Sequence, residues 1–436
     1  MKQTLSLILA LVLAVGILAG CGNAAPAATE AKPEGTEAPA AAQKQEPIEI
    51  VYSGPDEWVR SQLQTDKGGY EKIVEKFEAA NPGVTVKLAS EPWGSWGQKQ
   101  PVLIAGGDAP DVFMINGGDA ASYYEGGYLA DLGDMDPAFL DKFYPGVLAS
   151  YRSGETLMAL PFTTDCRVLW YNKEIFEAAG LDPNTPPTTW AELAEYAEKC
   201  SQVTIDGQQV YGFGMDLGLK ELPAQSLLAA SDGNILDADM KPAVNTDTFK
   251  HFLQTLVDME GTYQRDYVSM SHEDVATLFG QKKIAMIIAG GWVWSLNEGL
   301  SGEDWYGMAP TPKMDENAPD GSWGGGWAIA VSSKSEHLEE AKKFAAALYD
   351  DELAYMLNTD VPPFTPGDSK CELFNNPRAT VFAEEMANGR KLMPPCTHTT
   401  EISTVVWEEA AKAITGECTV DEAVAAMETR INEVLG

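Results

Sequence analysis

The sequence predicts an α/β body composed of two lobes. The part of the chain that follows residue 46 has about 390 residues, which exceeds the size at which a single hydrophobic core stops growing. Strand-like and helix-like segments alternate along this part in two successive regions. Such alternation is typical of parallel sheets that are covered by helices. We therefore expect two lobes of the α/β class.

The first element is an export signal over residues 1–20. Lys2 gives a charged start, and the almost unbroken apolar run from Leu5 to Leu18 is shorter than the ~20 residues of a membrane span. The run ends in Leu-Ala-Gly before Cys21, which resembles the lipobox of bacterial lipoproteins. The resemblance implies a chain that starts at a lipidated Cys21 and is held on the outer face of the bacterial cell membrane by acyl chains such as palmitate. An ordinary signal peptide with a chance cysteine is the alternative.

The second element is a linker over residues 21–46. It consists mainly of Ala, Pro and Glu, and it contains no aromatic residue and no Leu, Ile or Val. Such a segment buries too little apolar surface to offset the entropy lost on ordering. We expect a flexible spacer between the lipid anchor and the folded body.

Composition narrows the classes of partner. The chain is 44% hydrophobic and 22% charged, and 65 acidic residues against 30 basic ones give a net charge of −35. This charge argues against a nucleic-acid partner, since phosphate binding needs a basic face. It also disfavours an anionic ligand unless a local basic pocket exists.

The six cysteines do not predict a disulfide scaffold. Lipidation of Cys21 leaves five, which is an odd number, and none of them forms a C-x-x-C pair. A body of this size folds without such bridges. One bridge between Cys371 and Cys396 remains possible.

The first α/β region is expected to contain three strands and two helices. The strands are predicted at 48–52, 84–88 and 111–115; one helix starts at Tyr70 and stops at Asn81-Pro82-Gly83, and a short one ends at Gly106-Gly107. Ligands of parallel sheets bind at the carboxyl ends of the strands. Here these ends are residues 52–54, 90–96 and 116–119.

The second α/β region begins with a strand at 168–171 and helices at 173–179 and 189–200. Thr189 and Glu192 form a capping-box pattern at the start of the second helix. Residues 203–213 are predicted to form a hairpin that turns at Asp206-Gly207. Further strands are expected at 284–289 and 327–331, and further helices at 247–260, 274–279, 336–349, 401–413 and 420–434.

Four ordered segments resemble extracellular solute-binding proteins of family 1, the maltose-binding-protein-like receptors of ABC importers. They are Tyr70 to Leu88, Ala109-Pro110-Asp111-Val112-Phe113 with the following Gly127 to Leu132, Leu169-Trp170-Tyr171-Asn172-Lys173 with the following Trp190, and Gly325-Gly326-Trp327 to Val331. The resemblance implies two lobes, a hinge of crossing strands and a ligand cleft between the lobes, which close by hinge motion.

The same resemblance predicts the division of the chain. We expect crossings at 160–163, at 287–291 and near 328–332. The N-terminal lobe is then 47–162 plus 288–328, and the C-terminal lobe is 163–287 plus 329–436. A membrane permease of the ABC transporter is the implied partner of a monomeric receptor.

Tryptophans beside glycines at loop mouths are the candidate stacking surfaces for a sugar. We assign Trp292 to ligand stacking, whereas Trp190, Trp294 and Trp407 are expected to be core residues. Ligand stacking and core packing stay open as alternatives for four further residues, namely Trp93, Trp96, Trp323 and Trp327.

Acidic and amide side chains near these loops are candidate partners for sugar hydroxyls. We single out Asn116, Asp119, Asp165 and Asp216, with a helix cap or a solvated turn as the alternative for each. Arg167 and Arg378 are expected to pair with acids.

The sequence leaves two alternatives to sugar capture. A secreted glycoside hydrolase would need only two carboxylates, but the sequence has no H-E-x-x-H or G-x-S-x-G motif, and we expect no enzyme, no cofactor and no metal. Within binding proteins, a polyamine or another small cation is the alternative ligand, because an acidic, tryptophan-rich cleft can bind ammonium.

Overall fold

The computed structural model describes residues 47–55, 70–91, 93–143, 145–163, 165–205, 207–218, 225–297, 299–349, 376–387, 389–390, 392–393 and 398–436. These residues all lie in one compact unit, Glu46–Gly436. The predicted signal peptide, Cys21 and the linker lie outside the described residues, as do Cys371 and Cys396. In the described part of the chain, the longest apolar helices still fall short of what a membrane span requires.

The first sheet has the order β2-β1-β3-β15-β6. Its strands are β1 (Ile48–Pro55), β2 (Val84–Glu91), β3 (Val112–Asn116), β15 (Trp327–Val331) and β6 (Leu160–Pro161). β1 pairs in parallel with β2 and β3, which confirms the predicted β-α-β-α-β pattern. β15 lies antiparallel between β3 and β6.

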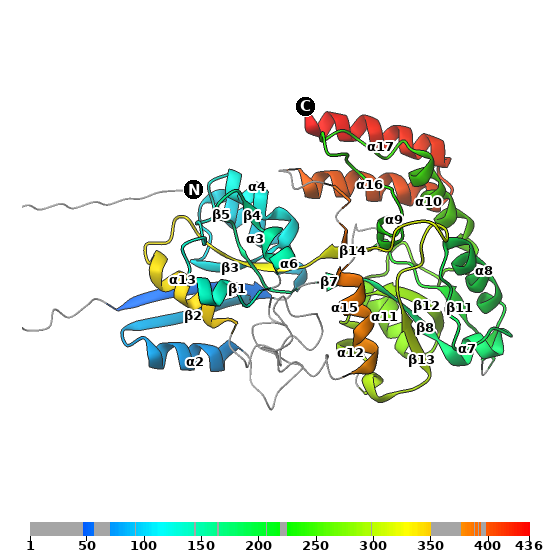
Figure 1. Cartoon of the computed structure of the whole chain (residues 1–436), viewed down its shortest axis with the longest axis horizontal. Coiled ribbons are helices and arrows are strands. Elements are labelled where there is room, and N and C mark those ends of the chain that lie inside the picture. The colour runs from blue at the N-terminus through cyan, green and yellow to red at the C-terminus, as the bar shows by residue number, and fades with distance from the viewer. Residues whose placement is uncertain are drawn as a thin grey trace, which may run out of the picture. The chain divides into compact units, whose positions relative to one another are not determined.

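Helices α2 (Tyr70–Ala80), α3 (Trp93–Gly106) and α13 (Leu338–Ala347) accompany this sheet, and α2 and α13 lie beside β2 and β1 in Figure 1. α2 buries Tyr70, Ile73 and Phe77, which recur at helical spacing. These side chains and Phe344 of α13 pack with Tyr52 in one core, which defines the first lobe.

The second sheet has the order β11-β12-β8-β13. Its strands are β11 (Tyr211–Phe213), β12 (Ile284–Ala289), β8 (Val168–Asn172) and β13 (Tyr306–Ala309). β8 and β12 are buried along their whole length because helices cover both faces of the sheet.

The alternation of side chains along β8 divides the core of the second lobe into two clusters. Leu169 and Tyr171 face α8 (Trp190–Ser201), α10 (Asp247–Asp258), α16 (Thr399–Ile414) and α17 (Val420–Leu435). Val168 and Trp170 face α11 (His272–Gly280), α12 (Val293–Leu296) and α15 (Thr380–Ala387). Figure 1 shows α16 and α17 side by side, as their contacts require. The capping box of Thr189 and Glu192 is present at the start of α8.

A small third sheet lies where the chain passes from one sheet to the other. β7 (Asp165–Cys166) pairs with β14 (Ser322–Gly325), which also pairs with β16 (Gly389–Arg390). β7 connects β6 of the first sheet with β8 of the second, and β14 continues directly into β15 of the first sheet. Two neighbouring crossings are therefore hydrogen-bonded to each other.

Strand pairing divides the later part of the chain differently from the predicted lobe boundaries. β13 pairs with β8 of the second lobe, although residues 288–328 were expected in the first. β15 beyond residue 328 and α13 pack in the first core, although residues 329–436 were expected in the second. The crossing expected at 287–291 is also displaced, because β12 ends there within the second sheet and the chain crosses between β14 and β15.

The predicted hairpin at 203–213 is confirmed only in part: β9 (Thr204–Ile205) and β10 (Gln208–Gln209) pair antiparallel, whereas residues 211–213 form β11 and pair in parallel with β12. The remaining described elements are short. They are η1 (Gly117–Asp119), α4 (Ala120–Glu125), α5 (Pro137–Leu140), α6 (Pro145–Ala149), β4 (Arg152–Ser153), β5 (Thr156–Leu157), α7 (Lys173–Ala178), α9 (Gln225–Ala229), η2 (Glu260–Thr262), η3 (Leu300–Gly302) and η6 (Pro377–Ala379). Cys200 and Cys418 are free cysteines, and the thiol of Cys166 donates to the Phe382 carbonyl at 3.6 Å.

Candidate ligand-binding site

The segment from β14 to β15 carries two of the predicted tryptophans into different lobes. Trp323 lies in β14, and Trp327 begins β15 in the first sheet. Gly326, between the strands, has a φ of 145°, which L side chains rarely adopt. Its carbonyl accepts from the Gly117 amide at 2.9 Å. Both tryptophans are half-buried.

Arg167 joins Trp323 to Trp292. Its guanidinium carbon lies 5.4 Å from the ring centre of Trp323 and 5.9 Å from that of Trp292, which are cation–π distances. Trp292, which follows the last strand residue of β12 and the pair Gly290-Gly291, is half-buried, whereas Arg167 is only 8% exposed. We refer to Trp292, Arg167 and Trp323 as the tryptophan–arginine group.

Backbone hydrogen bonds hold Arg167 in place. The Arg167 amide donates to the Ser322 hydroxyl oxygen at 3.0 Å, and that hydroxyl donates to the Arg167 carbonyl at 2.6 Å. The Thr311 hydroxyl donates to the same carbonyl at 3.0 Å. The guanidinium therefore projects from a fixed backbone rather than from a mobile loop.

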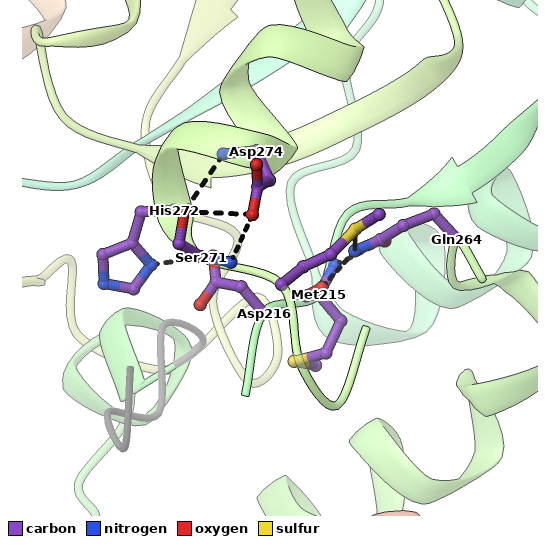
Figure 2. Close-up of polar contacts among 7 residues, drawn as sticks. Met215, Asp216, Gln264, Ser271, His272 and Asp274 are labelled. Atoms are coloured by element: carbon purple, nitrogen blue, oxygen red, sulfur yellow. Dashed lines mark hydrogen bonds and ion pairs between the residues drawn. The ribbon is translucent and has the colours of Figure 1, made fainter. Parts of the chain in front are cut away.

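Asp216 and His272 extend this group on the side of Trp292. Nδ1 of His272 lies 2.8 Å from Oδ2 of Asp216, and the imidazole centre lies 6.0 Å from the ring of Trp292. Figure 2 shows the imidazole directed at the carboxylate, next to the capping box that Ser271 and Asp274 form at the start of α11. His272, the first residue of α11, is thus oriented by the helix start.

Gln264 fixes the backbone that carries Asp216. Its side-chain carbonyl accepts from the Met215 amide at 3.0 Å, and its side-chain amide donates to the Met215 carbonyl. Gln264 is buried, so this two-point contact is shielded from water (Figure 2). Asp216, which is 6% exposed, follows directly.

Trp96 belongs to the first core, although its ring lies beside Trp327. It is 5% exposed, and its indole N–H donates to the Ser53 hydroxyl at 3.2 Å, which in turn donates to Gln100. The ring centres of Trp96 and Trp327 are 5.8 Å apart. Trp96 therefore supports Trp327 from inside the lobe.

Asn116 and Asp119 make local and interlobe contacts at η1. The Asn116 side chain caps η1 by accepting from the Gly118 amide at 2.8 Å. The Asp119 carboxylate accepts from the Thr400 hydroxyl of α16 at 2.7 Å, and α16 belongs to the second lobe. Burial raises the pKa of Asp119, although the hydrogen bond from Thr400 opposes this shift.

The other residues singled out from the sequence are two site candidates, one arginine and three core tryptophans. Trp93 begins α3 and Asp165 begins β7, but their side chains lie outside those that the structure describes. Arg378 pairs with Asp304 at 3.0 Å, as predicted. Trp190 and Trp294 are buried, as predicted for core residues, and Trp407 is half-buried.

The sequence alone did not single out His272 or Gln264. A histidine directly after a serine N-cap is a usable signal for His272, because the cap fixes where the first helical residue lies. Gln264 lies in a loop far from Met215 in sequence, and no local pattern indicates this contact.

The group combines the surfaces that a polyol needs. Half-buried indole faces can stack on apolar C–H faces, a guanidinium is able to donate hydrogen bonds, and the Asp216 carboxylate is able to accept them. Within the part of the chain that the structure describes, no group of three or more His, Cys, Asp or Glu side chains is arranged to hold a metal ion.

The chain is similar in sequence to known binding proteins. Residues 61–355 match the family model of the bacterial extracellular solute-binding proteins. A binding protein of Brucella abortus is 27% identical over 331 residues, which cover 74% of this chain and 79% of that protein. The sn-glycerol-3-phosphate-binding periplasmic protein of Agrobacterium fabrum is 26% identical over 287 residues, or 61% of this chain and 60% of that protein.

Solved structures share the fold at lower identity. An ABC transporter solute-binding protein of Thermotoga lettingae, bound with α-D-tagatose, has a TM-score of 0.74 and 23% identity and covers 90% of this chain and all of its own. A maltose-bound protein of T. maritima has a TM-score of 0.75 and 23% identity, with coverage of 88% and 99%. These similarities show a two-lobed α/β fold.

Proposed function

Because the chain belongs to the bacterial extracellular solute-binding proteins, which bind solutes outside the cytoplasm for ABC importers, we propose that it captures a carbohydrate and delivers it to a membrane permease. The observation that carries the proposal is the pair of half-buried indole rings, Trp292 and Trp323, which both lie at cation–π distance from Arg167. Aromatic faces of this kind stack on the C–H faces of a sugar ring.

The ligand is proposed to bind between the lobes, where β14 continues into β15. Trp327 would then contribute from the first lobe, while Trp323, Trp292 and Asp216 contribute from the second. The solved relatives bound with tagatose and with maltose support a sugar as the ligand. Hinge closure over the sugar would present both lobes to the permease.

The mature protein is proposed to be a monomeric lipoprotein. Cys21 would carry the lipid on the outer face of the cell membrane, and residues 21–46 would act as the spacer. This proposal rests on the apolar run that ends in Leu-Ala-Gly-Cys and on the composition of the linker.

Thermal unfolding with a panel of mono- and oligosaccharides and polyamines tests the function. A ligand that binds only the folded state stabilises it by RT ln(1 + [L]/Kd), or about 2.7 kcal/mol at a hundredfold excess over Kd. We expect a clear rise in Tm with one class of sugar and no consumption of that sugar. A rise in Tm with spermidine or putrescine alone would show that the ligand is a polyamine and not a sugar. Breakdown of a glycan during the assay would indicate a hydrolase instead.

Replacing Trp292 with alanine should weaken sugar binding by about 1–3 kcal/mol, since the variant loses an aromatic contact with the ligand. Titration calorimetry with the sugar from the panel measures this loss. Trp407→Ala is the matched control, because Trp407 is a half-buried tryptophan of the same lobe that lies on α16. Equal losses in both variants, or an unchanged affinity in Trp292→Ala, would contradict stacking on Trp292.

A further inference from the structure

His272 is held beside the proposed sugar site by the start of α11. The Ser271 hydroxyl oxygen accepts from the Asp274 amide at 3.3 Å, and the Asp274 carboxylate accepts from the Ser271 amide at 3.0 Å. This capping box fixes the backbone of the first helical residue, which is His272 (Figure 2). The His272 side chain is only 14% exposed, so its imidazole lies inside the lobe rather than in solvent.

The imidazole contacts two other residues of the site at once. Its Nδ1 lies 2.8 Å from Oδ2 of Asp216, and its ring centre lies 6.0 Å from that of Trp292, with 30° between the ring planes. The backbone that leads into Asp216 is in turn held by the two hydrogen bonds between Gln264 and Met215. The carboxylate is therefore a fixed anchor, and the imidazole that it orients lies beside the indole.

Trp292 needs such support more than the other tryptophan of this segment. Trp294 is 8% exposed, and its indole N–H donates to the Tyr306 hydroxyl at 2.8 Å, so the core fixes its ring. Trp292 is half-buried and lies in the turn between β12 and the four-residue helix α12, so neither a strand nor a long helix fixes its ring. A stacking surface binds best when neighbouring side chains already fix its rotamer.

We propose that His272 is a positioning residue of the sugar site, which uses the Asp216 carboxylate as an anchor to hold the Trp292 ring in the orientation that stacks on the ligand. This role rests on the proposed function and adds a residue that acts without touching the sugar. Fixing the ring before the ligand arrives removes an entropic cost of binding, so the affinity should depend on His272. Arg167 contacts the same ring at 5.9 Å, so loss of His272 should weaken binding without abolishing it.

Titration calorimetry with the purified full chain tests this role. Maltose and tagatose are the first probes, followed by the panel sugar that raises Tm most. His272→Ala should bind the sugar roughly two- to tenfold more weakly, the size expected for one aromatic contact. His251→Ala is the matched control, because the His251 ring lies 5.4 Å from that of Trp190, a buried core tryptophan of the same lobe. The affinity of this control should equal that of the wild type.

A double-mutant cycle shows whether His272 acts through Trp292. In the Trp292→Ala background the ring to be positioned is absent, so adding His272→Ala should not change the affinity further. The coupling between the two substitutions should then equal the whole effect of His272→Ala. Equal fold-losses with and without Trp292 would mean that His272 contacts the sugar itself or acts on the whole lobe, and would overturn the positioning role.

Two further variants separate the ring of His272 from its hydrogen bond. His272→Phe keeps an aromatic ring beside Trp292 and should regain part of the lost affinity, while it lowers Tm because the buried Asp216 carboxylate loses this donor. His272→Asn keeps an N–H donor for Asp216, yet it should bind the sugar as weakly as His272→Ala. Full affinity in His272→Asn with none regained in His272→Phe would contradict the proposal.

Nuclear magnetic resonance at pH 7 tests the anchor in the wild-type chain, even if a His272 variant does not fold. The chain has four histidines, so a ¹⁵N-histidine label gives few imidazole signals, and replacing the other three in turn assigns His272 by elimination. An ionised carboxylate only accepts hydrogen bonds, so Nδ1 of His272 should carry a proton. A Nδ1 without a proton would rule out the anchor and the proposal with it.

The sugar panel separates failure of this role from failure of the proposed function. If a sugar binds the wild type and His272→Ala with the same affinity, the positioning role is wrong and the proposed function stands. If no saccharide of the panel binds the wild-type chain, the proposed function is wrong, and the positioning role falls with it.

Discussion

Replacing Trp170 with alanine is expected to lower the free energy of unfolding by about 3–5 kcal/mol. Trp170 is fully buried in β8, and its ring stacks on Tyr306 at 5.6 Å between ring centres and meets Trp294 edge-on at 5.1 Å. Its indole N–H donates to the Ala289 carbonyl at 3.1 Å. The substitution leaves a large cavity and a carbonyl of β12 without this donor.

Urea unfolding followed by circular dichroism measures the loss. Trp292→Ala is the matched control within the same lobe, because Trp292 is half-buried and the unliganded protein should lose much less stability without it. The two tryptophans therefore separate core packing from ligand stacking. Equal destabilisation by the two substitutions would place Trp292 in the core and weaken its assignment to the site.

Glu385→Gln is expected to remove a decline in stability between pH 4.5 and 7. Glu385 of α15 is 2% exposed, and burial raises its pKa from 4.5 to about 7, while hydrogen bonds from Thr311 oppose the shift. In this range the folded protein holds a proton that the unfolded chain has lost, so the free energy of unfolding falls as pH rises. At about 1.4 kcal/mol per pH unit, the fall amounts to about 3 kcal/mol.

Urea unfolding at pH 5 and pH 8 checks this sign. The variant should match the wild type closely at pH 5 and exceed it at pH 8, because glutamine still accepts from the Thr311 amide without carrying a charge. Glu409→Gln provides the opposite control. Burial alone would raise the pKa of Glu409, but Lys412 and Arg430 lower it overall, so this substitution should destabilise the protein at pH 8. A wild-type stability that stays flat from pH 5 to 8 would contradict the role of Glu385.

The elements with local start and stop signals could be predicted from the sequence. α2 has an apolar face at helical spacing, and its chain reverses at Asn81-Pro82-Gly83, where Gly83 adopts a φ of 95°. The capping box at Thr189 is equally local. Such signals depend on a few neighbouring residues, so they can be read before any tertiary contact is known.

The assignment of β15 could not be predicted in this way. Its partners in β3 precede it by more than two hundred residues, and the apolar run Trp327–Val331 would fit either sheet. Only the pairing with β3 and β6 decides that residues 327–331 belong to the first lobe. The displaced lobe boundaries follow from this non-local pairing and from the equally non-local pairing of β13 with β8.

In the candidate site, too, local features could be predicted from the sequence and non-local contacts could not. The glycines beside Trp292 and Trp323 predicted that these rings are not ordinary core residues, and in the structure both rings lie at cation–π distance from Arg167. The partners of Asp119 and Asp216 are Thr400 and His272, which lie far away in sequence. Their contacts depend on how α16 and α11 pack, which no spacing in the chain reveals.

The place of β15 in the first sheet has a consequence for biogenesis. Because β15 fills the position between β3 and β6, the first sheet stays incomplete until residue 331 has been made and exported. The second core in turn awaits α16 and α17 at the end of the chain. The N-terminal third of a nascent chain therefore lacks a finished core of its own, and such non-local pairing slows folding. We expect an export-competent, unfolded chain whose two halves acquire their native structure together, after the C-terminus has left the translocation machinery.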